Sequence, residues 1–383
     1  GVYTIASNGT SRPDFATIEE ALKALSHCGV DGSTTFLVGA GKYSAMTVDA
    51  FNGASHKNMV TFASATGKAS DVVISGTYHL TLNAVQHVRF ENLTFGNGTG
   101  TRGITFNGKC KDVEIYHCEV LMSPTATATA YGIYNYGTAV DSIRFIGNHI
   151  NGSYYGVYFY GSGTSKDGYN THIVFDSNLV ENAYYYTHYF YYTDFTSISH
   201  NTFLPRLSSG NYHYTYMYYC NLDRMEGNRY NFTRSTNINY WYNYLYYINR
   251  YNNDGRRGLV CNNEVIHTRG NGYGWYLGYD NMDFVNNSLL ATNAPYPFYS
   301  YNDGSNALHL KNNNIICLAG DGMRFYNTAN SVTYESNNIY SPNGVLIDGN
   351  TYSTYADIVA VTGDTNLTMK RSYFIDSTKS LEP

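Results

Sequence analysis

An asparagine that recurs at a near-constant interval constrains the fold of this chain more than any other feature. It lies in the pattern apolar-x-x-Asn-x-apolar, as in Phe145, Asn148 and Ile150. In two earlier units Leu93 and Cys118 take the asparagine position. Between positions 93 and 337 the mean interval is about 27 residues, which is typical of solenoid proteins. The asparagines are Asn148, Asn178, Asn201, Asn228, Asn263, Asn287, Asn313 and Asn337.

Each repeat unit contains short segments in which inward and outward residues alternate, rich in β-branched and aromatic residues and without helical periodicity. The sequence therefore predicts an all-β fold, a single right-handed parallel β-helix of about 12 coils. We expect the recurring asparagine to adopt a left-handed conformation at a sharp turn. Its amide would then hydrogen-bond to the asparagine of the next coil, forming an internal ladder.

The chain is expected to form one domain over residues 1–383, because a solenoid grows by adding coils. Residues 1–30 are predicted to be an N-terminal cap with a helix within 13–25, where Phe15, Ile18, Leu22 and Leu25 share one face. Coils are expected over 31–345. Residues 346–383 are expected to be irregular and to precede further protein, with 351–361 forming either a short helix or a loop.

A second motif precedes each asparagine and alternates inward and outward positions, as in Val157-Tyr158-Phe159-Tyr160. Because neighbouring strands lie about 4.8 Å apart, the outward positions would form two columns of phenol rings. A shift of strand parity by one residue would bury these rings. The first column holds Tyr134, Tyr158, Tyr189, Tyr216, Tyr244, Tyr276 and Tyr299 and ends in Arg324. The second holds Tyr136, Tyr160, Tyr191, Tyr218, Tyr246, Tyr301 and Tyr326, with a gap at Gly278.

Two explanations of these columns are open. Cross-strand aromatic pairs stabilise a sheet by about 0.2–1 kcal/mol each, so the columns could be purely structural. Alternatively, an exposed aromatic strip marks an interaction surface. Tyrosine offers a flat ring for the C–H groups of a sugar and a hydroxyl for hydrogen bonding. A polysaccharide would match a long column, and a protein partner could bind the same face.

Composition excludes several classes of function. The net charge is −5 and the lysines and arginines are scattered, which argues against a nucleic-acid partner. No apolar run is long enough for membrane insertion. The six cysteines lack a CxxC spacing, so we expect no metal and no cofactor. The cysteines are expected to be buried thiols, although a disulfide between neighbouring coils is open.

The coil pattern resembles the right-handed parallel β-helix proteins of the pectate-lyase-like superfamily over nearly the whole chain. The stretch from Asp14 to Leu22, followed by Gly41-Lys42-Tyr43, is similar to the capped first coil of pectinesterases and related secreted proteins. Members of that superfamily commonly cleave or bind polysaccharides outside the cell. The resemblance implies a polysaccharide partner, on the strand face that carries the tyrosines here, and an extracellular or cell-surface location.

The catalytic motifs of that superfamily are missing from this sequence. The polygalacturonase motifs do not occur, which leaves hydrolysis by paired aspartates without support. Arg256-Arg257-Gly258 matches only the end of the Arg-x-Pro-x-x-Arg-x-Gly stretch of pectate lyases, and no coil carries an acidic cluster for calcium. A lyase would need a base, a cation and an acid. The candidates for these roles are His213, Arg250, Asp254 and Arg256, in or near the long interval before Asn263.

The sequence thus supports one leading hypothesis and two alternatives. The leading hypothesis is an extracellular or cell-surface module that binds polysaccharide through an exposed two-column tyrosine face without catalysis. The first alternative is a polysaccharide lyase acting on a uronate-containing glycan. The second is a non-catalytic structural or adhesive stalk whose tyrosine face binds a protein.

Overall fold

The computed structural model describes residues 1–6, 13–206, 212–233, 240–251, 255–267, 272–292, 297–302, 304, 307–319, 323–327 and 331–373. For 212–214, 240–242 and 327 it describes the backbone alone. The chain divides into two compact units, Gly1–Ala183 and Tyr184–Pro383. That residues 1–383 form a single domain stays a prediction.

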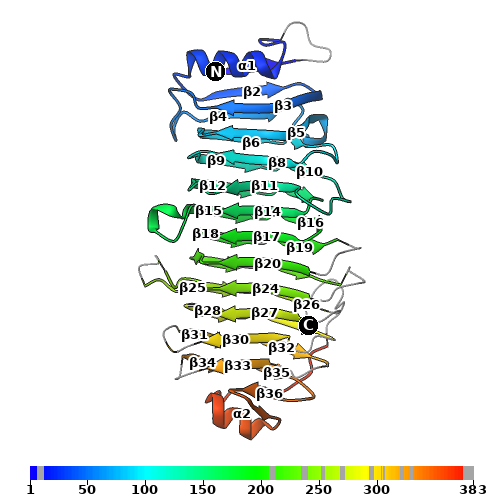
Figure 1. Cartoon of the computed structure of the whole chain (residues 1–383), viewed down its shortest axis with the longest axis vertical. Helices are drawn as coiled ribbons and strands as arrows, with labels where there is room; N and C mark the ends of the chain where they lie inside the picture. Colours follow the sequence, from blue (N-terminus) through cyan, green and yellow to red (C-terminus); the bar gives the residue numbers. More distant parts are fainter. Residues whose placement is uncertain are drawn as a thin grey trace. The chain divides into compact units, whose positions relative to one another are not determined.

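The first unit consists of parallel strands in successive coils (Figure 1). One sheet pairs β1 (Val2–Ile5), β2 (Thr34–Val38), β4 (Val60–Ser64), β6 (Gln86–Glu91), β9 (Lys111–Tyr116), β12 (Asp141–Ile146) and β15 (Asn170–Asp176), each with the next. A second series pairs β3 (Gly41–Asp49), β5 (Val72–Asn83), β8 (Arg102–Asn107), β11 (Tyr131–Tyr136) and β14 (Tyr155–Tyr160). A third series, which begins on β5, pairs β7 (Thr94–Phe95), β10 (Glu119–Leu121), β13 (His149–Asn151) and β16 (Leu179–Ala183).

The second unit repeats this arrangement. Its first series contains β18 (Thr193–Ser199), β21 (Asn221–Leu222), β22 (Arg224–Glu226), β25 (Gly258–Cys261), β28 (Met282–Val285), β31 (Leu308–Lys311) and β34 (Val332–Glu335). Its second contains β17 (Tyr186–Tyr191), β20 (Tyr212–Tyr218), β24 (Tyr240–Tyr246), β27 (Gly272–Gly278), β30 (Phe298–Asn302), β33 (Met323–Asn327) and β36 (Val345–Ile347). Its third contains β19 (Thr202–Pro205), β23 (Arg229–Asn231), β26 (Glu264–His267), β29 (Ser288–Ala291), β32 (Asn314–Cys317) and β35 (Asn338–Tyr340).

The core consists of the residues that point inward at every second strand position. Equivalent inward residues stack from coil to coil, so that the ring of Phe62 lies 4.9 Å from that of Phe36 and 5.7 Å from that of Phe90. Each coil covers the apolar edge of the next, which is why one repeated pattern suffices to bury the interior. The predicted all-β parallel solenoid with an N-terminal capping helix is confirmed.

The helix α1 runs from Ile18 to Cys28 and buries Ile18, Ala21 and Leu25 at the end of the first unit. Its start lies later than Pro13, where the sequence pattern placed it. Thr17 is the N-cap, since its Oγ1 accepts a hydrogen bond from the Glu20 N–H at 3.1 Å. The Glu20 carboxylate in turn accepts a bond from the Ala16 N–H at 2.8 Å. This reciprocal capping fixes the first turn of the helix.

The predicted asparagine ladder is present in the interior. The side chain of Asn263 accepts hydrogen bonds from the Asn228 N–H and Nδ2, both at 2.9 Å. Asn263 Nδ2 donates to Asn287 Oδ1 at 2.9 Å and to the Met225 carbonyl at 3.0 Å. In an earlier coil, Asn148 accepts a bond from the N–H of Cys118, which occupies the asparagine position there. Each buried amide is therefore satisfied by the coils on both sides, as burial of a polar group requires.

The prediction that the ladder asparagines themselves are left-handed is wrong, because the left-handed residue lies one position earlier in the chain. The left-handed residue is the one before the ladder asparagine, for example Gly147 (φ 67°), Ser177 (φ 60°) and Asn262 (φ 55°). The sharp turn is made there, at the surface. The ladder asparagine follows it with its side chain inside, where it bonds to the neighbouring coils.

The chain after the last ladder asparagine is more regular than expected. A strand β37 (Asn350–Tyr352) pairs antiparallel with β36, and α2 (Tyr355–Thr362) forms the helix that was one of two options for 351–361. Asp364 ends the ladder, because its carboxylate accepts bonds from the Asn337 N–H at 2.9 Å and Nδ2 at 3.1 Å. In Figure 1, α2 lies beside β36.

The cysteines and the helices bear on two further expectations. All six cysteines are reduced thiols; Cys28 is exposed and the other five are buried. Within the described residues, neither helix is both long and apolar enough to span a bilayer.

Candidate functional site: the tyrosine face

The predicted alternation of inward and outward residues is observed. In β14, Val157 and Phe159 are buried, whereas Tyr158 and Tyr160 are half-buried on the outside. In β24, the outward Tyr244 and Tyr246 flank the buried Leu245. Taking each unit by itself, we call its outward tyrosines its tyrosine face: those of β11 and β14 in the first unit, and those of β17, β20, β24, β27, β30 and β33 in the second.

In the second unit the first column is a continuous stack of rings. The ring of Tyr216 lies 4.9 Å from that of Tyr189 and 4.8 Å from that of Tyr244, at interplanar angles of 3° and 0°. Tyr276 continues the stack at 4.8 Å from Tyr244, and Tyr299 follows at 4.6 Å. The strand register explains this regularity, since each tyrosine is paired with its equivalent in the next coil.

This stacking changes what the column offers to a ligand. Each internal ring has a neighbour over both of its faces, so the flat face that the sequence suggested for sugar stacking is already occupied. Each residue of the column is half-buried, so only the outer part of its side chain remains accessible. The first column is therefore a row of phenol edges repeated from coil to coil.

The second column has the expected gap, and the structure shows why. Tyr218 stacks on Tyr191 at 5.1 Å and on Tyr246 at 5.4 Å. A Cβ at Gly278 would lie 2.2 Å from the ring of Tyr246. The Tyr246 ring thus fills the place that a side chain at position 278 would need. Beyond the gap, Tyr301 and Tyr326 resume the column with their rings 6.2 Å apart.

In the first unit the face is shorter. Tyr134 stacks on Tyr158 at 5.7 Å, and Tyr136 lies 5.1 Å from Tyr160. Tyr136 is the most exposed member, with 57% of its surface accessible. The guanidinium of Arg102 lies 3.9 Å from the centre of the Tyr134 ring, a cation–π contact that ends the column.

A third column, which the sequence analysis missed, lies at the turn after these strands. We call Tyr192, Tyr219, Tyr247 and Tyr279 the turn column. Successive rings are 5.6, 4.7 and 5.2 Å apart. All four residues are left-handed, with φ between 51° and 57°. In the sequence this column shows only as a second tyrosine directly after Tyr191, Tyr218 and Tyr246. Tyrosine is an unusual residue for positive φ, so these tyrosines did not indicate a turn.

The turn column meets the second column nearly at a right angle. The interplanar angle is 87° between Tyr191 and Tyr192, 82° between Tyr218 and Tyr219, and 72° between Tyr246 and Tyr247. Edge-to-face contact of this kind is a favoured aromatic geometry. A further tyrosine upstream of the first column, Tyr155 in β14 and Tyr273 in β27 among others, makes similar contacts with it. The face is thus wider than the two predicted columns.

Burial keeps the phenols of the face neutral. Burial raises the pKa of Tyr216, Tyr244 and Tyr276 well above the ordinary value, and neighbouring phenols raise it further. It also raises the pKa of Tyr279 to about 12, assisted by a hydrogen bond with Tyr301. At neutral pH these hydroxyls therefore act as uncharged donors and acceptors.

Of the four residues predicted for catalysis, the structure describes the side chains of Arg250 and Arg256 alone. Arg250 lies over the turn column, with its guanidinium 4.8 Å from the centre of the Tyr279 ring. Arg256 bridges Asp194 at 2.9 Å and Asp223 at 2.6 Å. Asp254 and the side chain of His213 lie outside the described residues. Among the residues that are described, no group of histidine, cysteine and carboxylate side chains is arranged to hold a metal ion.

Comparisons with known proteins add little. No protein-family model matches the chain, and no curated protein matches it. Among solved structures, it is similar to the pectin methylesterase from Aspergillus niger in deglycosylated form. The match has 13% sequence identity, covers 100% of this chain and 93% of that chain, and has a TM-score of 0.27. A likeness at this TM-score carries no argument about activity.

Proposed function

We propose that this chain binds a polysaccharide along its tyrosine face. The observation that carries the proposal is the continuous stack in the second unit, where Tyr189, Tyr216, Tyr244, Tyr276 and Tyr299 repeat one phenol per coil. A surface that repeats in one direction is matched by a ligand that also repeats. Polysaccharides offer hydroxyls and C–H groups at regular intervals, which suit rows of phenol hydroxyls and ring edges.

The rigidity of the stack favours such binding. A tyrosine held between two neighbours loses little rotamer freedom when a ligand arrives, so each contact costs little entropy. Individually weak contacts add up when they are linked along one polymer. Long chains are therefore expected to bind much better than short oligosaccharides.

Two arginines suggest a preference within this ligand class. Arg250 lies over the ring of Tyr279, and Arg324 hydrogen-bonds to the hydroxyl of Tyr326. Cations beside the phenol rows favour a polysaccharide that carries carboxylates. Cleavage is not proposed, because Arg256 already bridges two carboxylates and Arg250 is stacked on the turn column. The proposal places the protein outside the cell or at its surface, where such polymers occur.

The test is binding to an array of neutral and acidic polysaccharides, with two variants that remove hydroxyls but keep rings. Tyr216→Phe combined with Tyr244→Phe, in the middle of this stack, is expected to weaken retention at least about tenfold on any polymer that the parent binds. Tyr230→Phe is the matched control, because the Tyr230 ring is buried in the core. Retention that the double variant keeps, or no retention on any polymer, would contradict the proposal and favour the protein-binding stalk. Ultraviolet absorbance of unsaturated products in the same samples would reveal lyase activity.

A further inference from the structure

Arg102 of β8 takes the place of a tyrosine on the outer surface of the first unit. In the strand register it lies between Tyr78 of β5 and Tyr131 of β11. Tyr131 is paired in turn with Tyr155 of β14, and their rings stack at 5.2 Å with an interplanar angle of 4°. A cation thus stands within a row of phenols, upstream of the first column of this unit.

Aromatic rings hold the Arg102 guanidinium in place. It lies 3.9 Å from the centre of the Tyr134 ring and 4.8 Å from the centre of the Tyr78 ring. The Tyr134 ring is itself packed against that of Tyr131, with their centres 4.8 Å apart. Cation–π contacts position the cation without giving its N–H groups an oxygen acceptor.

The charge of Arg102 is not neutralised in the part of the chain that the structure describes. The other two described arginines of this unit are paired with carboxylates, Arg89 with Glu91 at 3.0 Å and Arg144 with Asp112 at 2.9 Å. Arg102 forms neither an ion pair nor a hydrogen bond with any described residue. It is half-buried, so a charge of opposite sign is attracted more strongly here than at a fully hydrated side chain.

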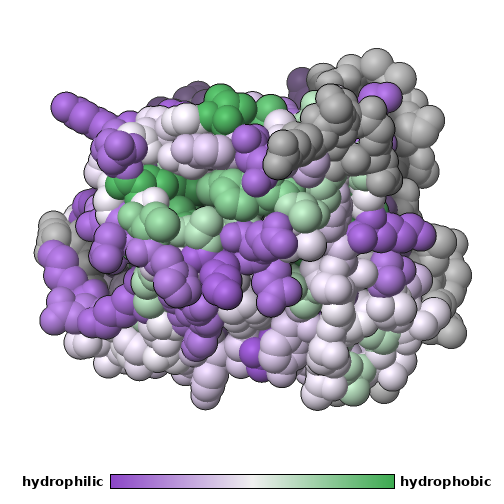
Figure 2. Space-filling view, turned by 90° about the horizontal axis from the view of Figure 1, so that it is seen from above, coloured by the Kyte–Doolittle hydropathy of each residue, from purple (hydrophilic) through white to green (hydrophobic). Residues whose placement is uncertain are grey.

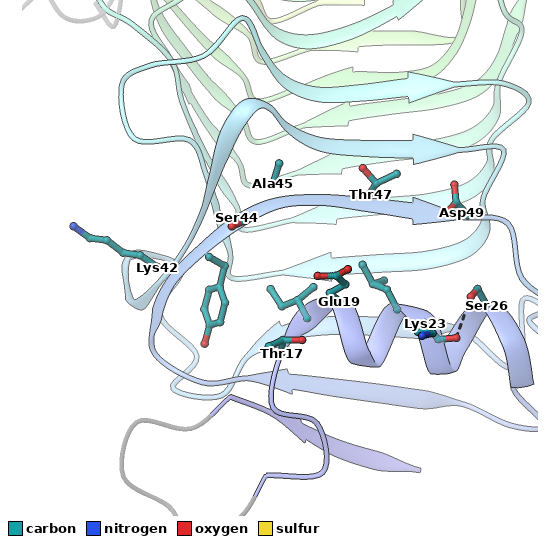
Figure 3. Close-up of a pocket in the computed structure, with 12 residues that line it drawn as sticks. Thr17, Glu19, Lys23, Ser26, Lys42, Ser44, Ala45, Thr47 and Asp49 are labelled. Carbon is teal, nitrogen blue, oxygen red and sulfur yellow. Dashed lines mark hydrogen bonds between the residues drawn. The ribbon is translucent and has the colours of Figure 1, made fainter.

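Short polar side chains continue the tyrosine face of this unit on the other side of Arg102. They form two rows in register, Thr47, Thr81 and Thr105, and Asp49, Asn83 and Asn107. Figure 3 shows Thr47 and Asp49 on the same side of β3. The Asp49 carboxylate already accepts a hydrogen bond from Asn83 at 2.7 Å. Arg102 therefore lies where rows of hydroxyls and amides meet the phenol columns.

The rows end at the cap of the unit. Beyond β3 lies α1, and Figure 2, seen from that end, shows hydrophobic residues exposed between hydrophilic ones. A ligand that follows the face would thus run over β3, β5, β8, β11 and β14, with Arg102 between its two ends.

We infer that Arg102 binds an anionic group, a carboxylate or a sulfate ester, of a polysaccharide on the first unit. This inference rests on the proposed function and adds a charged contact to it. A guanidinium donates two parallel hydrogen bonds to either kind of oxyanion. Because the rings already hold the cation, little side-chain entropy is lost on binding. The neighbouring hydroxyls and phenols would contact the uncharged parts of the same polymer.

Two matched pairs of polymers serve as probes, alginate with its propylene glycol ester and dextran sulfate with dextran. The members of a pair share a backbone and differ in charge, and the two pairs distinguish carboxylate from sulfate. Binding of the full chain to each immobilised polymer is measured by biolayer interferometry. The charged member of at least one pair is expected to bind at least about tenfold more tightly than its neutral partner. High salt is expected to reduce this preference.

Three variants assign the preference to Arg102. Arg102→Gln is expected to reduce it to less than about twofold, and Arg102→Lys, which keeps the charge, is expected to restore most of it. Lys57→Gln is the control, because it removes the same charge from an exposed position between β3 and β4 and is expected to keep the preference. Circular dichroism verifies that each variant is folded.

The outcomes separate this inference from the proposed function. If the parent binds charged and neutral polymers alike, or if Arg102→Gln keeps the preference, the inference is overturned while polysaccharide binding stands. A preference that Lys57→Gln loses equally, or that Arg102→Lys does not restore, would overturn it as well. If no polymer is retained at all, the proposed function fails together with the inference.

Discussion

Acid is expected to destabilise the second unit through two buried histidines. His188 and His267 have 1% and 0% of their surface exposed. The His188 ring lies 4.6 Å from that of Phe190 and 4.7 Å from that of Phe203. Burial lowers the pKa of His188 from 6.5 to about 3 and that of His267 to about 4. Both imidazoles are therefore neutral in the folded chain.

The sign and size of this effect of pH on the free energy of unfolding follow from proton linkage. Below pH 6.5 the unfolded chain binds protons at these histidines and the folded chain does not, so the free energy of unfolding falls as the pH falls. At pH 5 the unfolded histidine lies 1.5 pH units below its pKa, which corresponds to a loss of about 2 kcal/mol per histidine. The free energy of unfolding continues to fall until the pH reaches the pKa values of the folded histidines, about 3 for His188 and about 4 for His267. Above pH 7 the two histidines cause no such loss.

Other titrating groups also change the free energy of unfolding with pH, so the parent protein alone does not isolate the two histidines. Burial raises the pKa of Asp280 well above its usual range, and this opposes the histidines, because the folded chain then binds the proton more readily. The pKa values of Asp112 and Asp141 are lowered, so their contribution is lost only below pH 4. The difference between parent and variant isolates the histidines.

The assay is urea unfolding followed by circular dichroism at pH 5 and pH 8. His188→Leu and His267→Leu are each expected to reduce the parent's loss of stability between pH 8 and pH 5 by about 2 kcal/mol, and together by about 4 kcal/mol. His27→Gln, at an exposed position of α1, is the control for replacing a histidine outside the core. If the leucine variants keep the parent's pH dependence, the histidines are not buried as neutral groups and the packing described for this core is refuted.

Three further predictions test the scaffold. Asn263→Ala leaves the amides and carbonyls of the adjacent coils without partners and is expected to lower the free energy of unfolding by about 2–4 kcal/mol, measured by urea unfolding. Gly278→Ala is expected to cost about 1–3 kcal/mol through its clash with the Tyr246 ring, and Tyr246→Ala in the same chain should remove most of that cost. Thr17→Ala removes the N-cap of α1 and is expected to cost about 1 kcal/mol, seen as a lower melting temperature.

The repeated elements of the fold were readable from the sequence because one physical rule generates each of them. A buried amide needs partners in the coils on both sides, so the asparagine recurs and marks every coil from Asn148 to Asn337. The outward tyrosines followed from strand alternation in the same way. What the pattern misplaced was the left-handed residue, since the turn at Gly147 and Asn262 precedes the asparagine that the periodicity singles out.

The contacts across the tyrosine face were less predictable. Periodicity indicates which residues face outward but not how their rings tilt, so the occupied faces of Tyr216 and Tyr244 were not foreseen. The turn column was missed because tyrosine is rarely left-handed, and only the neighbouring coils make Tyr219 and Tyr247 favourable there.

The central claim is that the tyrosine face contacts a polysaccharide, and protection from hydroxyl-radical oxidation tests it most directly. The chain is oxidised by hydroxyl radicals with and without the polymer that binds best, and the oxidation of each tyrosine is quantified by mass spectrometry. Tyr218 and Tyr246 are expected to be protected by the polymer, whereas Tyr355 and Tyr373, which are 48% and 75% exposed and belong to no column, should react equally in both samples. Equal reactivity of Tyr218 and Tyr246 with and without a bound polymer would contradict the account.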